Sequence, residues 1–329
     1  MTTTGEFFYL DPASISPTTK PWAKVDGGST SSFRLTARQR SVTNLRDALP
    51  AATLPSGPLP GVFGGDIDVG GFAAFHAPLN SDTADLFTTD AAVRERYYPQ
   101  VEALLRANLS GSSGAGKVAR VVIFDHTIRR HDPAAPRQPV RQVHVDQTPA
   151  AAAARVRRHV KPAADAEALL QPGRRFQIIN VWRPIGHAAA DFPLAVVDWR
   201  SAKGEGDGGD LVPVDLLYPV RNRAEGDPDD DRGKEVPPDG GDGTEGYEVK
   251  GETYGVLPNE AHRFYYVKDM APDEALFIKC FDSWSQGQPG GKKGVSGFTP
   301  HTAFVDPATP AGAKPRESIE VRCLVFYDE

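Results

Sequence analysis

The sequence predicts a mainly β protein, an antiparallel sandwich or jelly roll with flanking helices. Short runs rich in Val, Ile, Phe and Tyr recur through most of the chain, and clusters of Gly, Pro, Asp and Ser separate them. With 329 residues, the chain is long for one compact domain and short for two. This length favours a single core with an added extension.

Residues 1–115 are expected to form an N-terminal extension with helices that pack on the barrel. Its beginning mixes short apolar runs such as Phe7–Leu10 with many Pro, Gly, Ser and Thr, which indicates short strands and irregular loops. Asp90 then precedes a helical spacing of apolar residues that reaches Leu105. Because Pro99 interrupts this spacing, we expect one kinked helix or two short ones.

Residues 116–329 are expected to form the β core. Thr148 and Pro149 are a good N-cap and first-turn pair, so a helix should follow them. A stretch at 201–245, rich in Gly, Asp and Pro, is expected to interrupt the strands as a long acidic loop. The expected strands are 119–124, 142–146, 176–182, 194–199, 262–267, 275–281, 302–305 and 318–327.

The charge pattern argues against nucleic acid as a partner. The formal net charge is -6, but Glu225–Glu245 alone holds nine acidic and two basic residues, so the remainder is close to neutral. Such a chain lacks the basic face that neutralises a phosphate backbone. No run approaches the roughly 18 apolar residues of a membrane-spanning helix. Without a secretory signal and with two cysteines, a cytoplasmic protein with no membrane partner is expected.

His144 and Asp146 are candidate metal ligands, because residues at i and i+2 of a strand point to the same face. A third ligand must come from elsewhere, and His301 is well placed at the start of a late strand. Two histidines and one carboxylate leave three positions open on an octahedral iron, as in non-haem Fe(II) oxygenases. A 2-oxo acid can take two of these positions and O2 the third. The alternative is a surface histidine beside an acidic residue that caps the following helix.

The C-terminal strand carries a polar series of one parity. Arg316, Ser318, Glu320 and Arg322 should all face the barrel interior, while the apolar residues between them pack against covering elements. A guanidinium there can form a bidentate pair with a carboxylate.

Seven segments carry a resemblance to a known family, and they span about 180 residues in order: 143–148, 177–184, 193–198, 262–266, 278–283, 300–304 and 315–322. Together they resemble fungal and bacterial secondary-metabolism oxygenases that include a gibberellin desaturase and an accessory protein of cephalosporin methoxylation. The resemblance implies a double-stranded β-helix with iron at its mouth and a small-molecule substrate. It also implies that Arg316 and Ser318, an Arg-x-Ser beyond the distal histidine, bind the far carboxylate of 2-oxoglutarate. Arg322 is the second choice.

Three further polar residues are candidates for the site. Alternation puts Asn180 on one face of its strand and Arg183 on the other, so both cannot point inward. Asn180 is a candidate contact of the co-substrate. Arg183 contacts a carboxylate of co-substrate or substrate, or else forms a buried ion pair with a neighbour such as Asp198. Lys279 lies in an apolar strand, where it needs either a salt-bridge partner or a ligand role.

The expected function is therefore that of an oxygenase that uses Fe(II), 2-oxoglutarate and O2. Its substrate is expected to be a small secondary metabolite or an amino-acid-derived compound, oxidised at an unactivated C–H bond by hydroxylation, desaturation or ring formation. Two alternatives remain. One is a metal-dependent hydrolase or isomerase with the same ligands, which works without O2 and without Arg316. The other is a non-catalytic accessory protein of a biosynthetic pathway. The sequence does not fix the oligomeric state.

Overall fold

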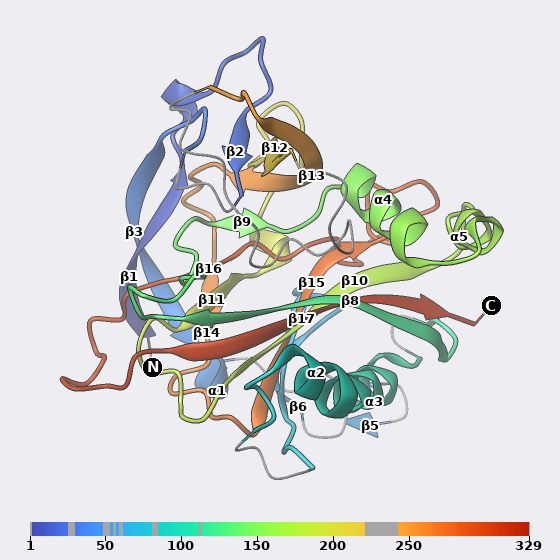
Figure 1. Cartoon of the computed structure of the whole chain (residues 1–329), viewed down its shortest axis with the longest axis horizontal. Coiled ribbons are helices and arrows are strands. Elements are labelled where there is room, and N and C mark those ends of the chain that lie inside the picture. The colour runs from blue at the N-terminus through green and yellow to red at the C-terminus, as the bar shows by residue number, and fades with distance from the viewer. Residues whose placement is uncertain are drawn as a thin grey trace.

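Strands are the main regular structure of the described chain, and most of them lie in two large sheets that share a core (Figure 1). This confirms the mainly β expectation. The computed structural model describes residues 2–25, 30–48, 53–54, 57–58, 62–80, 85–111, 114–220 and 243–328.

The larger sheet has nine strands, and it holds all three expected metal ligands at its centre or next to it. Its neighbours pair antiparallel except β12 with β2 and β14 with β3, which pair parallel. The order is β1 (Thr2–Leu10), β3 (Leu35–Asn44), β14 (Phe264–Tyr266), β11 (Leu194–Val197), β16 (His301–Ala303), β9 (His144–Val145), β13 (Tyr247–Val256), β12 (Leu211–Pro219) and β2 (Trp22–Lys24).

The smaller sheet has six strands and forms the other wall of the core. All of its neighbours pair antiparallel. The order is β6 (Val62–Asp66), β7 (Phe72–His76), β15 (Glu274–Asp282), β10 (Phe176–Pro184), β17 (Glu317–Tyr327) and β8 (Val118–Arg130). A separate two-stranded ribbon joins β4 (Thr53–Leu54) to β5 (Gly57–Pro58).

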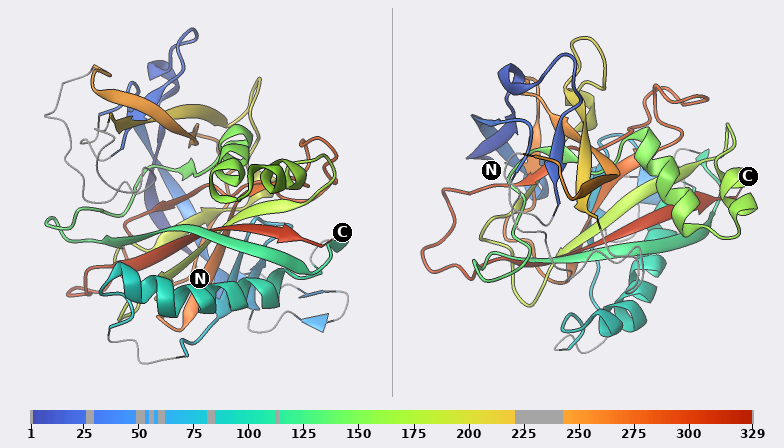
Figure 2. Two further views of the ribbon diagram at one scale, coloured as in Figure 1. Left: turned by 45° about the vertical axis from the view of Figure 1, so that its right-hand side comes forward. Right: turned by 45° about the horizontal axis from the view of Figure 1, so that its top comes forward.

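Helices cover the outer face of the smaller sheet and one end of the core. The segments α2 (Asp90–Ala92) and α3 (Tyr98–Leu109) lie below β8 and β17 in Figure 1, and the views in Figure 2 agree. A π-helical turn, η2 (Val93–Tyr97), joins them just before Pro99, so the expected interrupted helix is confirmed. The remaining helical elements are η1 (Pro12–Ser14), α1 (Leu45–Ala48), α4 (Pro149–His159), α5 (Ala163–Leu169) and η4 (Trp199–Ser201).

The helix α4 begins where the sequence predicted. The Thr148 side chain accepts a hydrogen bond from the Ala151 N–H at 3.1 Å, and Pro149 occupies the first turn. Its buried residues Ala152 and Val156 join the apolar core between the two sheets. Because this helix follows β9 directly, its docking fixes the chain just after the expected metal ligands.

The strand β17 shows the two-sided pattern expected from its sequence. Its series Ile319, Val321, Cys323 and Val325 packs on the outer side with apolar residues of α3. The alternate series Ser318, Glu320 and Arg322 lines a pocket between the sheets together with Arg316. The prediction of an inward polar series is therefore confirmed.

The expectation of a long loop at 201–245 is wrong for its first part. Residues Leu211–Pro219 form β12, which pairs with β13 over its whole length. Residues 221–242, which carry most of the acidic charge, lie outside the described residues. The N-terminal strands β1 and β3 extend the larger sheet at β14, and β6 and β7 extend the smaller one at β15. The division of the chain at residue 115 stays a prediction.

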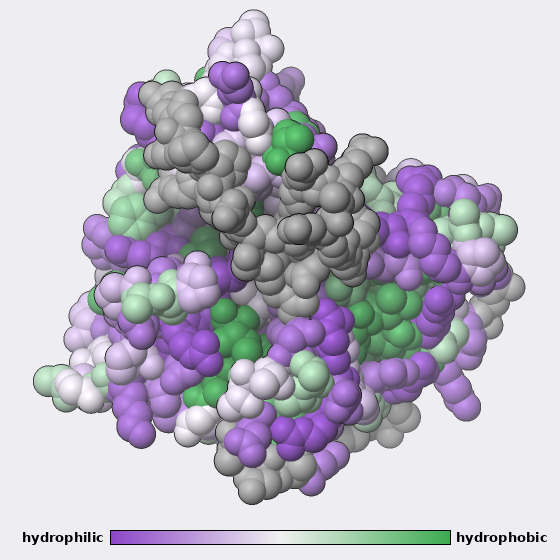
Figure 3. Space-filling view, in the orientation of Figure 1, coloured by the Kyte–Doolittle hydropathy of each residue, from purple (hydrophilic) through white to green (hydrophobic). Residues whose placement is uncertain are grey.

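The surface in the orientation of Figure 1 is mostly hydrophilic, with small separate hydrophobic patches (Figure 3). Within the described part of the chain, no helix is long and apolar enough to cross a membrane.

Candidate metal centre and pocket

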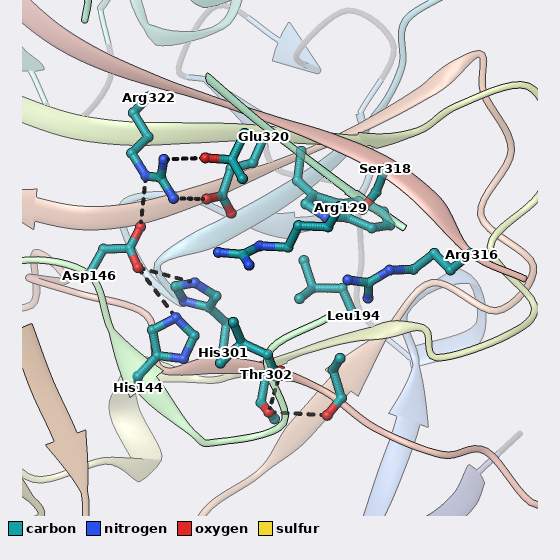
Figure 4. Close-up of a pocket in the computed structure, with 14 residues that line it drawn as sticks. Arg129, His144, Asp146, Leu194, His301, Thr302, Arg316, Ser318, Glu320 and Arg322 are labelled. Atoms are coloured by element: carbon teal, nitrogen blue, oxygen red, sulfur yellow. Dashed lines mark hydrogen bonds and ion pairs between the residues drawn. The ribbon is translucent and has the colours of Figure 1, made fainter. Parts of the chain in front are cut away.

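The structure brings His144, Asp146 and His301 together at one point. The strands β9 and β16 are antiparallel neighbours, and His144 stands directly opposite His301 in their register. Asp146 follows β9 by one residue. One ligand atom from each of the three lies within 4.8 Å of the others. The Nε2 atoms of His144 and His301 lie 3.3 and 3.8 Å from Oδ1 of Asp146 (Figure 4).

Both histidines have the orientation that metal ligation requires. Nδ1 of His144 lies 2.8 Å from the carbonyl oxygen of Gln142, and Nδ1 of His301 lies 3.0 Å from that of Thr299. A backbone carbonyl oxygen accepts a hydrogen bond and donates none, so Nδ1 of each ring carries the hydrogen and the Nε2 lone pair of the neutral ring faces the site. Burial, followed by the charge of His144, lowers the pKa of His301 and so favours its neutral form.

Asp146 is held as a carboxylate. Burial alone raises its pKa, but the hydrogen bond with His144 and the charge of Arg322 outweigh burial and hold the pKa of Asp146 well below its usual value. Burial lowers the pKa of His144, but the hydrogen bond with Asp146 and the charge of Asp146 outweigh burial, so the pKa of this imidazole is raised. A cation bound at this point would take the place of the proton that the raised pKa favours on Nε2 of His144.

The second oxygen of Asp146 has its own partners. Oδ2 accepts hydrogen bonds from Nδ2 of Asn180 at 2.7 Å and from Nε of Arg322 at 3.3 Å. These bonds fix the carboxylate so that Oδ1 faces the two histidines. Arg322 is also bound to Asp125 at 3.1 Å and to Glu320 at 2.7 Å. The structure thus places Asn180 and Arg322 behind the metal ligand, with the Arg322 donors engaged by protein carboxylates.

Arg316 lies in the pocket with part of its guanidinium group unpaired. The side chain is 1% exposed, and its Nε has no partner among the described residues. Its Nη1 donates to the carbonyl oxygen of Phe192 at 2.6 Å, and its guanidinium carbon lies 5.7 Å from the centre of the Trp182 ring. Phe192 has a φ of 43°, an uncommon conformation for a bulky residue, which directs this carbonyl toward Arg316. Ser318 lines the same pocket.

Arg183 and Lys279 lie outside this pocket. Arg183 is on the opposite face of β10, where Nη1 donates to the carbonyl oxygens of Ala77 at 3.1 Å and Pro272 at 3.0 Å. Lys279 is fully buried, and its Nζ lies 2.7 Å from Asp68 and 2.8 Å from Asp282. Both cations are therefore bound within the fold, and neither reaches the pocket, as a contact with co-substrate or another ligand role there would require. For Lys279, the alternative of a structural salt bridge is confirmed.

The sequence did not single out several residues that line the pocket. Arg129 is the most informative, because it adds a second guanidinium near Arg316. It stands opposite Ser318 in the pairing of β8 with β17. Only that register could have revealed it, since β8 lies outside the segments that carry the family resemblance. The other unpredicted lining residues are Thr127, Val140, Trp182, Leu194, Thr302 and Ala303.

Comparisons with known proteins agree with this geometry. Residues 64–326 match the family model described as Oxidoreductase/YMDC permease-like domain. Aspirochlorine biosynthesis protein N of Aspergillus oryzae is 36% identical over 183 residues, which cover 55% of this chain and 59% of that protein. The chain therefore spans less than two thirds of that relative's length. The Fe(II)/2-oxoglutarate-dependent dioxygenase nvfI of Aspergillus novofumigatus is 31% identical over 265 residues, which cover 79% of this chain and 78% of that protein.

A solved structure shows the same fold. The iron and alpha-ketoglutarate-dependent endoperoxidase NvfI superposes with a TM-score of 0.70 at 26% identity, over 100% of this chain and 99% of that one. Fold and site together define a jelly-roll protein with a two-histidine, one-carboxylate metal centre. The chain belongs to the family described as Oxidoreductase/YMDC permease-like domain, and its homologues include fungal hydroxylases/desaturases and an Fe(II)/2-oxoglutarate-dependent dioxygenase of secondary metabolism. This confirms the resemblance predicted from the sequence.

Proposed function

We propose that the chain is an Fe(II)/2-oxoglutarate-dependent oxygenase that oxidises an unactivated C–H bond of a small molecule. The observation that carries this proposal is the convergence of His144, Asp146 and His301 beside a pocket that also contains the buried Arg316. A hydrolase or isomerase with the same metal ligands has no need of that arginine. A non-catalytic accessory protein has no need of the intact ligand set.

The donor set fits iron. Two imidazole nitrogens and one carboxylate oxygen that converge from one side are the ligands of non-haem Fe(II) oxygenases. Iron bound there would activate O2, and 2-oxoglutarate would be the co-substrate that is oxidised together with the substrate. The hydrogen bonds of both histidines to backbone carbonyls keep their Nε2 atoms directed at this point.

The chain's own residues supply orientation and shielding. Asn180 and Arg322 hold Oδ2 of Asp146, so that Oδ1 stays directed at the metal position. Arg316 and Ser318 bind the far carboxylate of 2-oxoglutarate, since both line the pocket and Nε of Arg316 has no partner among the described residues. Trp182 lies beneath that guanidinium and excludes water from the pair.

The substrate class and location follow from the same proposal. We infer a small secondary metabolite or an amino-acid-derived compound as substrate, and no nucleic acid or membrane partner. The relatives named for hydroxylation, desaturation and endoperoxidation support this class. Cys280 and Cys323 are free and buried, which suits a reducing compartment such as the cytoplasm.

Anaerobic titration tests the proposal. Protein loaded with Fe(II) is expected to develop a weak visible charge-transfer band when 2-oxoglutarate is added, because the 2-oxo acid chelates the metal. After exposure to O2, 2-oxoglutarate should be converted to succinate. His301→Ala should show neither effect. If the wild-type protein binds Fe(II) but develops no band and consumes no 2-oxoglutarate, this function is excluded.

A further inference from the structure

Three arginines line the pocket, and they differ in how they are held. Arg322 is bound to the carboxylates of Asp125, Asp146 and Glu320. Arg316 and Arg129 have no carboxylate within ion-pair distance among the described residues. The pocket therefore contains one guanidinium in direct ion pairs and two that have no carboxylate in direct contact among the described residues.

The charge of Arg129 acts on Arg316, and the carboxylate of Glu320 attracts both guanidinium groups without contacting either. Burial, followed by the charge of Arg129, lowers the pKa of Arg316, although a guanidinium stays protonated at neutral pH. In Figure 4 both side chains extend into the pocket that Leu194 also lines. Two cations that face one buried space repel each other, and a carboxylate between them relieves that repulsion. Its two oxygens have enough lone pairs to accept from both groups.

The pocket is too small to hold 2-oxoglutarate unless one of its side chains moves. The cavity is about 30 Å³, room for roughly two water molecules and too little for a five-carbon dicarboxylate. Arg316 is held by the Phe192 carbonyl and by stacking on Trp182. Among the described residues, the Arg129 side chain makes one hydrogen bond, from Nη1 to the carbonyl oxygen of Gln138 at 3.0 Å. Arg129 is therefore the long side chain that leaves its place at the lowest cost.

We propose that Arg129 moves from the Gln138 carbonyl onto the far carboxylate of 2-oxoglutarate and holds it jointly with Arg316. The inference rests on the proposed function, because it concerns the same co-substrate. It assigns Arg129 as a specificity-determining residue. Two guanidinium groups on one carboxylate favour a 2-oxo diacid over a 2-oxo monoacid, since only the diacid carries a group to place between them.

The test measures binding without turnover. Manganese-loaded protein is titrated with 2-oxoglutarate and, separately, with pyruvate, which lacks the far carboxylate; calorimetry is the readout. The variant Arg129→Met removes the charge and keeps most of the length of the side chain. Arg130→Met is the matched control, because Arg130 is the next residue of β8 and pairs at the surface with Glu317 at 2.7 Å.

We expect Arg129→Met to lower the affinity for 2-oxoglutarate by about tenfold or more and to leave the affinity for pyruvate unchanged. Arg130→Met should change neither affinity. In the double variant Arg129→Met with Arg316→Met, the fold-loss of 2-oxoglutarate affinity should be smaller than the product of the two single fold-losses, because both side chains act on one carboxylate. Unchanged 2-oxoglutarate affinity in Arg129→Met overturns the inference and leaves the proposed function intact. Equal weakening of both acids also overturns it, since Arg129 then acts at the metal end. Failure of the wild-type protein to bind 2-oxoglutarate removes the proposed function itself.

Discussion

Asn180 offers the sharpest test of how the protein holds its metal ligand. Its Nδ2 donates to Oδ2 of Asp146 at 2.7 Å, and its own Oδ1 has no partner among the described residues. Replacing Asn180 with Leu keeps the approximate size of the side chain and removes one hydrogen bond to a buried carboxylate. Because Oδ1 makes no bond that the fold would lose, the effect on stability should be small compared with the effect on Asp146.

The size of that effect follows from the bond that is lost. A hydrogen bond to a charged group contributes about 1.5–3 kcal/mol, and about 1.4 kcal/mol corresponds to a factor of ten in a binding constant. Arg322 still holds Oδ2 in the variant, although at a longer distance of 3.3 Å. We therefore expect the affinity for Fe(II) or Mn(II) to fall by about 10- to 100-fold.

Chelator competition measures this loss, and thermal unfolding shows whether the variant is folded. Asn259→Leu is the matched control, because Nδ2 of Asn259 also donates to a carboxylate, that of Asp210, at 3.0 Å away from the metal centre. The control should keep the wild-type metal affinity. If folded Asn180→Leu binds metal as tightly as the wild-type protein, Asn180 does not position Asp146.

Three other outcomes are expected. Alanine at His144, Asp146 or His301 should abolish stoichiometric Fe(II) binding without unfolding the protein, and metal analysis and circular dichroism measure these two properties. A folded variant with normal iron content would remove that residue from the ligand set. Arg316→Ala should raise the half-saturating 2-oxoglutarate concentration by about tenfold or more with little change in iron affinity, and an unchanged value would exclude Arg316 as the anchor. Lys279→Met should lower the free energy of unfolding, measured by urea denaturation, by about 3–5 kcal/mol, because two buried carboxylates lose a partner. A loss of metal binding in the folded variant would instead support a role of Lys279 at the site.

The parts of the site that depend on alternation along one strand could be predicted from the sequence. His144 and Asp146 share a face because they are two residues apart, and the inward series from Arg316 to Arg322 follows from the same period. The sequence indicates His301 as the third ligand, but it does not predict the pairing of β9 with β16 that brings His301 opposite His144. A motif gives the residue types of a metal site, whereas the distance between ligands depends on sheet register.

Long-range partners could not be predicted. A buried lysine at position 279 indicates a need for a counter-charge, but one of its two partners is Asp68, more than 200 residues earlier in the chain. Arg183 could be placed on the face opposite Asn180, yet its partners are backbone carbonyls, which leave no trace in the sequence. In β12, Leu211, Val214 and Leu217 are buried at intervals of three residues. Because this segment lacks the alternation of a regular strand and lies beside an acidic Gly-rich stretch, its sequence predicts a loop.

Strand β17 links the metal centre to the expected co-substrate site. Arg322 on this strand is neutralised by carboxylates and acts on Asp146, a metal ligand. Arg316 directly precedes the same strand; its guanidinium has no carboxylate partner among the described residues, and its Nε has no hydrogen-bond partner there. The ion pairs of Arg322 therefore stand at the metal end, and the guanidinium groups of Arg316 and Arg129, which have no direct carboxylate contact, stand at the other. With Arg129 moved as proposed, a 2-oxo diacid would lie with its chelating end at the metal position and its far carboxylate toward Arg316 and Arg129. Because the outer face of β17 packs on α3, the packing of one helix supports both ends of that arrangement.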